Sequence, residues 1–123
     1  MKGNPRVIAA LNEALREALT AANQCFLHAG MCENWGYFKF AAHRKKESNG
    51  QTKCAETLIQ RILFLEGTPN TTDPAQLEIG ANVKTQLEND LARELAVAAM
   101  YCRFVRLASE EDDPGSRELF EHA

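Results

Sequence analysis

The sequence predicts an all-α protein, a bundle of three long helices with one long crossover and a short fourth helix. Apolar residues recur at three- and four-residue spacing through three long stretches. No stretch shows the two-residue alternation that is typical of a half-buried strand. Residues 67–82 lack helical periodicity and are rich in turn formers, so a long loop is expected between the second and third helices.

Composition and charge are those of one globular domain, which we expect to span residues 1–123. Of the 123 residues, 45% are hydrophobic and 25% are charged, and the net charge is −3. The sequence contains no stripe of basic residues that would indicate nucleic-acid binding. Residues 44–46 are expected to form a solvated basic helix face. No apolar run has the length of a signal peptide or a membrane span, which predicts a cytoplasmic protein without membrane insertion. The four cysteines show no zinc-type spacing and are expected to be reduced and mostly buried: Cys25, Cys32, Cys54 and Cys102.

The first helix is predicted over residues 5–35. Asn4 is a good N-cap, Pro5 fits the first turn, and Gly36 closes the helix. About 29 residues at a rise of 1.5 Å give a rod of roughly 43 Å. Its apolar stripe consists of Leu11, Leu15, Ala18, Ala22, Cys25 and Ala29.

The second helix is predicted over residues 38–66 and should return antiparallel to the first, because Gly36 leaves room only for a tight connection. Residues 48–50, Ser-Asn-Gly, are poor helix formers, which predicts fraying or a bend near Gly50. Gly67 is expected to adopt the left-handed conformation that ends many helices, and Pro69 prevents continuation. The core-facing stripe is expected to comprise Leu58, Ile62 and Leu65, widened by Ile59 and Leu63.

The crossover, residues 67–82, can reach roughly 53–58 Å when extended, enough to span the bundle. The second and third helices would then be parallel, which is the ferritin-like topology. The third helix is predicted over residues 83–110 after the N-cap Asn82, and Asp113 is expected to cap a fourth helix over residues 114–123. Most of a full fourth helix is missing, so we expect an open groove or a second chain that fills it.

Glu94 is the one charged residue within the apolar stripe of the third helix. It lies at the edge of the stripe and reaches solvent, or it is a buried carboxylate kept for a metal ion, since burying an unpaired charge is costly. The sequence alone leaves both interpretations open. The stripe comprises Leu87, Leu91, Glu94, Ala98, Cys102 (with Tyr101) and Val105.

Three segments carry a family resemblance: MKGNPRVIAALNEALREALTAANQCFLHAGMCENWG, LIQRILFLEGTPN and IGANVKTQLENDLARELA. The chain resembles bacterioferritin, the haem-containing branch of the ferritin family, from Met1 to about Leu95 and more faintly to Phe120. The resemblance implies a four-helix bundle that oxidises ferrous iron at a di-iron centre and assembles into a cage of twenty-four subunits that stores iron. It also implies haem between two subunits, ligated by a methionine from each.

Most of the residues that the family uses for this chemistry are replaced in this chain. The family's first-helix glutamate falls on Ala18, its second-helix Glu-x-x-His pair on Gln51 and Cys54, and its third-helix glutamate on Glu94. The fourth-helix pair falls beyond Ala123, so five of the six di-iron ligands are absent and ferroxidase activity is not expected. Haem is not expected either, because Thr52 replaces the methionine ligand.

The resemblance also places Cys25, where the family has a tyrosine, near Cys54 and Glu94. Cys54 and Glu94 could then bind zinc or another thiophilic ion. Alternatively, the thiols only fill a core that has lost its polar ligands, or Cys25 and Cys54 form a disulfide. His28 is expected at an interface or the surface, and Trp35, Tyr37 and Phe38 in the core or at a subunit contact.

Two functional hypotheses follow. The first is a bacterioferritin-like subunit of an iron-storage cage or smaller assembly, alone or with an active subunit, that does not oxidise iron itself. The second is a ferritin-like scaffold or adaptor of a larger unrelated complex, whose open groove binds a partner helix. An active bacterioferritin iron oxidase would need ligands that the sequence does not contain.

Overall fold

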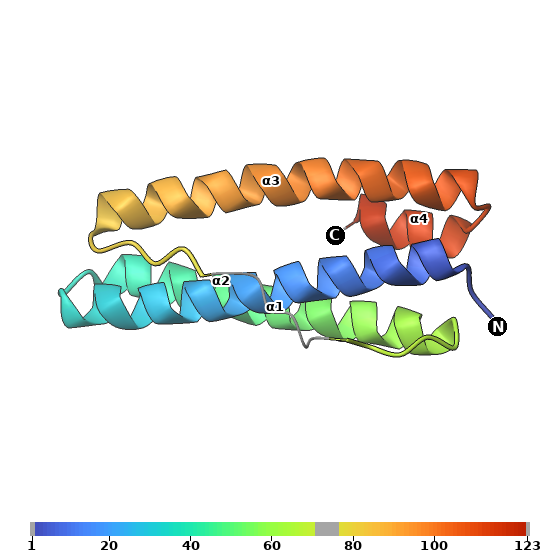
Figure 1. Ribbon diagram of the computed structural model, residues 1–123. Coiled ribbons are helices and arrows are strands. Elements are labelled where there is room, and N and C mark those ends of the chain that lie inside the picture. The colour runs from blue at the N-terminus through green and yellow to red at the C-terminus, as the bar shows by residue number, and fades with distance from the viewer. Residues whose placement is uncertain (1, 71–76, 123) are drawn as a thin grey trace.

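The computed structural model describes residues 2–70 and 77–122, and its helices confirm the all-α prediction (Figure 1). The part of the crossover at residues 71–76 lies outside the described residues. No strand occurs in the described chain, and none of its helices is long and apolar enough to cross a membrane. The helices are α1 (Pro5–Asn34), α2 (Phe38–Phe64), α3 (Val83–Glu110) and α4 (Pro114–Glu121).

The predicted N-caps form at the starts of α1 and α3. The Asn4 side chain accepts a hydrogen bond from the backbone N–H of Arg6, and the Asn82 side chain accepts one from Thr85. These bonds satisfy backbone donors that have no partner within the helix. They fix where α1 and α3 begin.

The three long helices end in the same hydrogen-bonding pattern, the Schellman motif, in which a left-handed residue reverses the chain. At the end of α2, Glu66 N–H donates to Leu63 and Gly67 N–H donates to Ile62. The left-handed residue is Glu66, with φ of 61°, so the prediction that Gly67 has this role is wrong. Gly67 is required for a steric reason instead, because a Cβ at this position would lie 2.8 Å from Cγ2 of Ile8.

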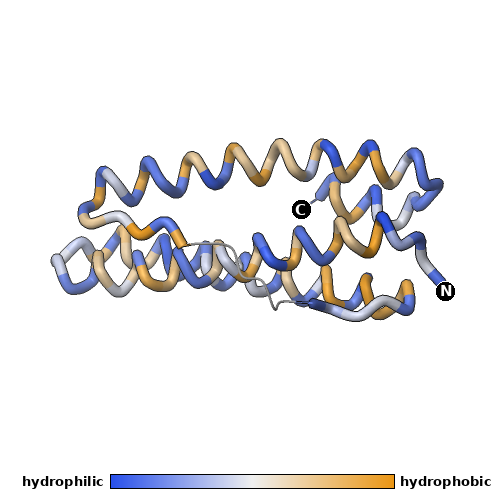
Figure 2. The backbone as a smooth tube through the Cα atoms, viewed as in Figure 1, coloured by the Kyte–Doolittle hydropathy of each residue, from blue (hydrophilic) through white to orange (hydrophobic). Residues whose placement is uncertain are grey.

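Helices α1 and α2 form an antiparallel hairpin, and their apolar residues recur turn after turn (Figure 2). The whole predicted stripe of α1 is buried, as are Leu58, Ile62 and Leu65 of α2. Leu63 is exposed, so it does not widen the stripe as predicted. The predicted fraying near Gly50 does not occur, because α2 is continuous there and Ser48 Oγ donates to the carbonyl of Ala22 at 2.8 Å. The alternative of a bend stays a prediction.

The crossover returns along α1, so that α2 and α3 are parallel (Figure 1). Asn12 bonds to the backbone of residues 68 and 70, whereas Gly80 bonds to His28, four turns further along α1. Helix α4 folds back beside the end of α3. There Asp113 Oδ1 accepts from the Ser116 backbone and pairs with Arg61 at 2.7 Å.

The bundle core is divided into an apolar end and a polar end. The apolar end, next to α4, contains the large buried hydrophobic side chains of all four helices, including Leu11, Leu58, Phe104 and Phe120. The other end, next to the turn between α1 and α2, buries polar side chains instead: Gln24, His28, Arg44 and Gln86. Because such groups are costly to bury without partners, each of them is expected to be hydrogen-bonded.

Candidate functional site

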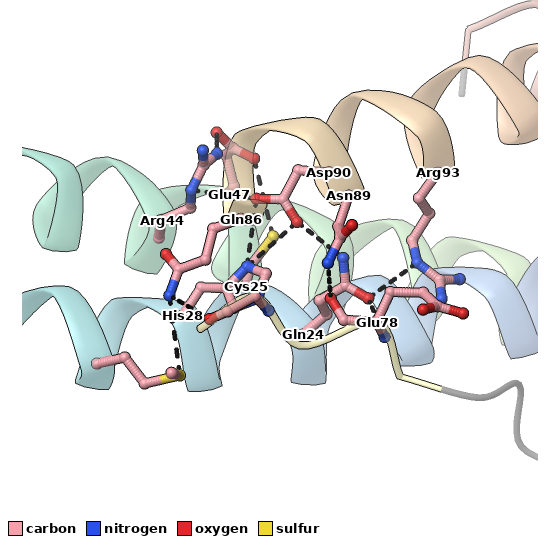
Figure 3. Close-up of polar contacts among 12 residues, drawn as sticks. Gln24, Cys25, His28, Arg44, Glu47, Glu78, Gln86, Asn89, Asp90 and Arg93 are labelled. Atoms are coloured by element: carbon pink, nitrogen blue, oxygen red, sulfur yellow. Dashed lines mark hydrogen bonds and ion pairs between the residues drawn. The ribbon is translucent and has the colours of Figure 1, made fainter. Parts of the chain in front are cut away.

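A cavity of about 650 Å³ lies between α1, α2 and α3, at the polar end of the core. Residues from all three helices line it, and charged side chains of α2 and α3 reach into it (Figure 3). The cavity also reaches Ala18, Gln51 and Glu94, three of the positions at which the family resemblance places iron ligands.

Arg44 is the central cation of this polar end. Its Nη1 lies 3.0 Å from Oε1 of Glu47, and its Nε lies 3.2 Å from Oδ2 of Asp90 (Figure 3). The guanidinium therefore joins carboxylates of α2 and α3 and balances their charge in a buried setting. The prediction that residues 44–46 form a solvated basic face is wrong for Arg44, which is only 5% exposed.

His28 is fully buried and uses both ring nitrogens. Nε2 accepts a hydrogen bond from the backbone N–H of Gly80 at 3.1 Å. Nδ1 lies 3.2 and 3.3 Å from the two carboxylate oxygens of Asp90. Because a backbone N–H only donates, Nε2 must be unprotonated, and Nδ1 carries the proton that Asp90 accepts. The prediction of a surface or interface histidine is wrong, because the crossover covers this ring.

Gln24, like His28, bonds both to the backbone of the crossover and to Asp90 of α3. Its Nε2 donates to Asp90 at 2.7 Å, and its Oε1 accepts from the backbone N–H of Glu78 and from Nε of Arg93. Arg93 also pairs with Glu17 at 3.0 Å. A continuous polar network therefore crosses from α1 to α3, with the crossover held against it.

The thiols of α1 lie against this network and are poorly disposed to ionise. Cys25 Sγ donates to Glu47 at 3.8 Å, and Cys32 Sγ donates to Gln86 at 3.2 Å. Burial, together with the negative charges of Glu47 and Asp90, raises the pKa of Cys25 to about 12. Burial is also the main cause that raises the pKa of Cys32. Both thiols are therefore poor nucleophiles at neutral pH.

All four cysteines are free, so the alternative disulfide between Cys25 and Cys54 is not formed. Cys25 faces Glu47, whereas Cys54 is seven residues further along α2, about 10 Å along the helix axis. The prediction that the cysteines are mostly buried holds for Cys25 and Cys32, but Cys54 is half-buried and Cys102 is exposed.

Cys54 and Glu94 line a second cavity, of about 820 Å³, between α2, α3 and α4. Cys54 Sγ lies 3.9 Å from the hydroxyl of Tyr101, and burial beside this thiol raises the pKa of Tyr101. Glu94 is exposed, which supports the interpretation that it lies at the edge of the α3 stripe. The binding of a thiophilic ion by Cys54 and Glu94 stays a prediction.

The residues present do not fit a di-iron centre. Ala18 has no donor atom, Gln51 offers an uncharged amide, and Glu94 is the one carboxylate among the four positions that the resemblance assigns. Within residues 2–70 and 77–122, no three side chains of His, Cys, Asp or Glu are grouped so that they could hold a metal ion. Thr52 is exposed and donates to the carbonyl of Ser48, so it offers haem no soft axial ligand.

Comparison with known proteins identifies the family. Residues 8–123 match the family described as "Ferritin: Ferritin-like domain". The chain belongs to this family. It is 40% identical to the bacterioferritins of Mycolicibacterium paratuberculosis and Brucella melitensis over 121 residues, which is 98% of this chain and 76% and 75% of those proteins. It is 37% identical to a bacterial ferritin of Synechocystis over 119 residues, 97% of this chain and 76% of that one. The chain is therefore bacterioferritin-like, as the sequence segments predicted.

Sequence reasoning missed the polar network of the bundle. Gln24 and His28 are four residues apart on α1, and Gln86 and Asp90 are four residues apart on α3. Polar residues at this spacing, on faces that neighbour the apolar stripes of two helices, were the available signal. Arg44 gave no such signal, because it precedes two lysines that are exposed.

Proposed function

We propose that this chain is a subunit of a bacterioferritin-type iron-storage assembly and does not oxidise iron at a di-iron centre of its own. Family membership and the similarity to proteins named bacterioferritin support the storage role. Assembly with copies of itself or with an active subunit would bring this chain into contact with iron as cargo.

The observation that carries the second half of the proposal is the donor set. Four ligand positions retain a single carboxylate, Glu94, and ferrous and ferric iron prefer several oxygen donors. Further along the cavity, the guanidinium of Arg44 already neutralises Glu47 and Asp90. These two carboxylates are thus paired with an internal cation rather than left for a metal ion.

The test combines native mass spectrometry with iron analysis of the same purified sample, after incubation with ferrous iron in air. We expect a large oligomer that retains iron and an oxidation rate no higher than that of buffer alone. A small, iron-free species would contradict the storage role.

A matched pair of variants tests the absence of an oxidation centre. Glu94→Gln removes the one retained ligand, and Glu88→Gln removes an exposed carboxylate of the same helix. Equal oxidation rates in both variants and in the unaltered protein are expected. Saturable oxidation that is lost in Glu94→Gln alone would contradict the proposal.

A further inference from the structure

A buried histidine holds the end of the crossover that precedes α3. The ring of His28 is fully buried, and its Nε2 accepts a hydrogen bond from the backbone N–H of Gly80 at 3.1 Å. Gly80 is buried as well and lies three residues before the start of α3. Because histidine takes up a proton close to physiological pH, this contact depends on pH, whereas a contact between two backbone groups does not.

Protonation of the His28 ring removes this hydrogen bond. A protonated imidazole carries a proton on each nitrogen, so both nitrogens donate and neither accepts. The backbone N–H of Gly80 also only donates, so two donors would then face each other. The contact is therefore complete while the ring is neutral and is lost when the pH falls far enough to protonate Nε2.

The charges around the ring permit the proton to enter. Asp90 of α3 lies 3.2 Å from Nδ1 of His28, and Arg44 of α2 pairs with both Asp90 and Glu47 (Figure 3). Two carboxylates and one guanidinium leave this cluster with one negative charge in excess. A proton on His28 makes the cluster neutral, and a balanced charge is less costly to bury than an unbalanced one.

The other titratable groups around the ring do not disturb this balance. They are Cys25 and Cys32 of α1, His43 of α2 and Glu78 of the crossover. Burial raises the pKa of both thiols, so they stay uncharged. His43 and Glu78 are exposed, and solvent screens their charges. Arg93 of α3 is paired with Glu17 at 3.0 Å.

We propose that His28 is a pH-sensitive switch of the crossover: protonation of Nε2 detaches Gly80 from α1 and loosens residues 77–82, while Nδ1 keeps the ring on Asp90. Two other hydrogen bonds of this segment do not titrate, one from the Glu78 N–H to Gln24 and one from Gln86 to the carbonyl of Gly80. The release is therefore local and admits water to the polar end of the core. It is independent of the proposed role in iron storage.

Amide hydrogen exchange followed by NMR tests the release at a single residue. The protection factor of the Gly80 amide is corrected for the intrinsic effect of pH on exchange, so it reports local opening. Between about pH 7.5 and about pH 5 we expect it to fall about ten-fold, as loss of one hydrogen bond implies. The Leu58 amide, in the apolar end, should keep its protection. A constant value for Gly80 would overturn the proposal, and so would an equal fall for Leu58, which would mean global unfolding.

A matched pair of variants assigns the effect to His28. His28→Gln retains a side-chain oxygen that can accept from Gly80 but takes up no proton. His43→Gln removes the exposed histidine of the same end of the bundle. The fall in Gly80 protection should persist in His43→Gln and be absent from His28→Gln. A fall in both variants, or in His28→Gln alone, would overturn the proposal.

The titration of the ring gives a second measure that needs no variant. In the unaltered protein, the ring nitrogen chemical shifts of His28 should change with the same midpoint as the protection factor of Gly80. Coincident midpoints are expected, because one protonation causes both changes. Separate midpoints would show that another group controls the contact and would overturn the proposal.

Discussion

Nε2 of His28 accepts a hydrogen bond from the backbone N–H of Gly80, and this contact holds the crossover against α1. Gly80 is buried, and a Cβ there would clash with the backbone of Gln86. The crossover can therefore approach the ring only with glycine at this position. Asp90 receives the proton on the opposite nitrogen, so one imidazole joins α1, the crossover and α3.

The first prediction concerns the tautomer of His28. Nε2 accepts a hydrogen bond from a backbone N–H, which can only donate. The neutral ring should therefore carry its proton on Nδ1 at pH 7. Long-range proton–nitrogen NMR spectra distinguish the two tautomers by the chemical shifts of the ring nitrogens. A proton on Nε2 would show that the contact with Gly80 does not form in solution.

The second prediction is that His28→Ala destabilises the fold by about 2–4 kcal/mol. The substitution leaves the Gly80 N–H without its partner and opens a cavity in the core. Urea unfolding followed by circular dichroism measures the free energy of unfolding. His43→Ala is the matched control, because His43 is exposed and pairs with Glu47 at the surface; its effect should stay within about 0.5 kcal/mol. Equal losses in both variants would contradict the role assigned to His28.

The third prediction concerns the internal cation. Arg44→Met keeps an unbranched apolar stem but removes the guanidinium, whose charge balances Glu47 and Asp90. Leaving these carboxylates without their cation should cost about 2–4 kcal/mol of unfolding free energy at pH 7. Lys45→Met, at the exposed neighbouring position, should change little. An equally small change for Arg44→Met would mean that Arg44 belongs to a solvated face after all.

The fourth prediction uses the pH dependence of stability. Burial alone would raise the pKa of Asp113, but hydrogen bonds from Ser116 and the charge of Arg61 outweigh it, so the pKa is lowered. A carboxyl group with a lowered pKa in the folded state stabilises the fold above its unfolded pKa, near 4, and loses this contribution as the pH falls through the folded value.

Asp113→Asn should therefore be less stable than the unaltered protein at pH 7, by about 1–2 kcal/mol, and the difference should shrink below about pH 4. Unfolding free energies between pH 7 and pH 3 provide the measurement. Asp112→Asn is the control, since Asp112 is exposed, has φ of 53°, and asparagine accepts this conformation. A difference for Asp113→Asn that is constant over this pH range would contradict the electrostatic explanation.

The fold class and the buried stripes of α1 and α2 could be predicted because they depend on local patterns. Leu58, Ile62 and Leu65 repeat at helical spacing, and the caps Asn4 and Asn82 act on backbone groups a few residues away. Such signals are contained in short windows of sequence.

The polar end of the core could not be predicted in the same way, because its partners are distant in sequence. His28 and Asp90 are 62 residues apart, and Gln24 and Arg93 are 69 apart. Their pairing exists only once α3 lies beside α1. Arg44 looked solvated for the same reason: the residues beside it in sequence are exposed lysines, and its carboxylate from α3 is far along the chain.

The end of α2 supplies the last prediction, because the sequence assigned the left-handed conformation to the wrong residue. Glu66 has φ of 61°, which costs a residue with a Cβ roughly 1 kcal/mol and costs glycine little. Glu66→Gly should therefore raise the free energy of unfolding by about 0.5–1 kcal/mol, measured by urea unfolding.

Gly67→Ala should instead lower the free energy of unfolding. Its Cβ would lie 2.8 Å from Ile8 and 3.2 Å from Ile62, both part of the packed interior, so we expect a loss of about 1–3 kcal/mol. If Gly67 were the left-handed residue, Glu66→Gly would destabilise the helix end instead. The opposite signs of the two changes thus separate a conformational role for glycine from a steric one.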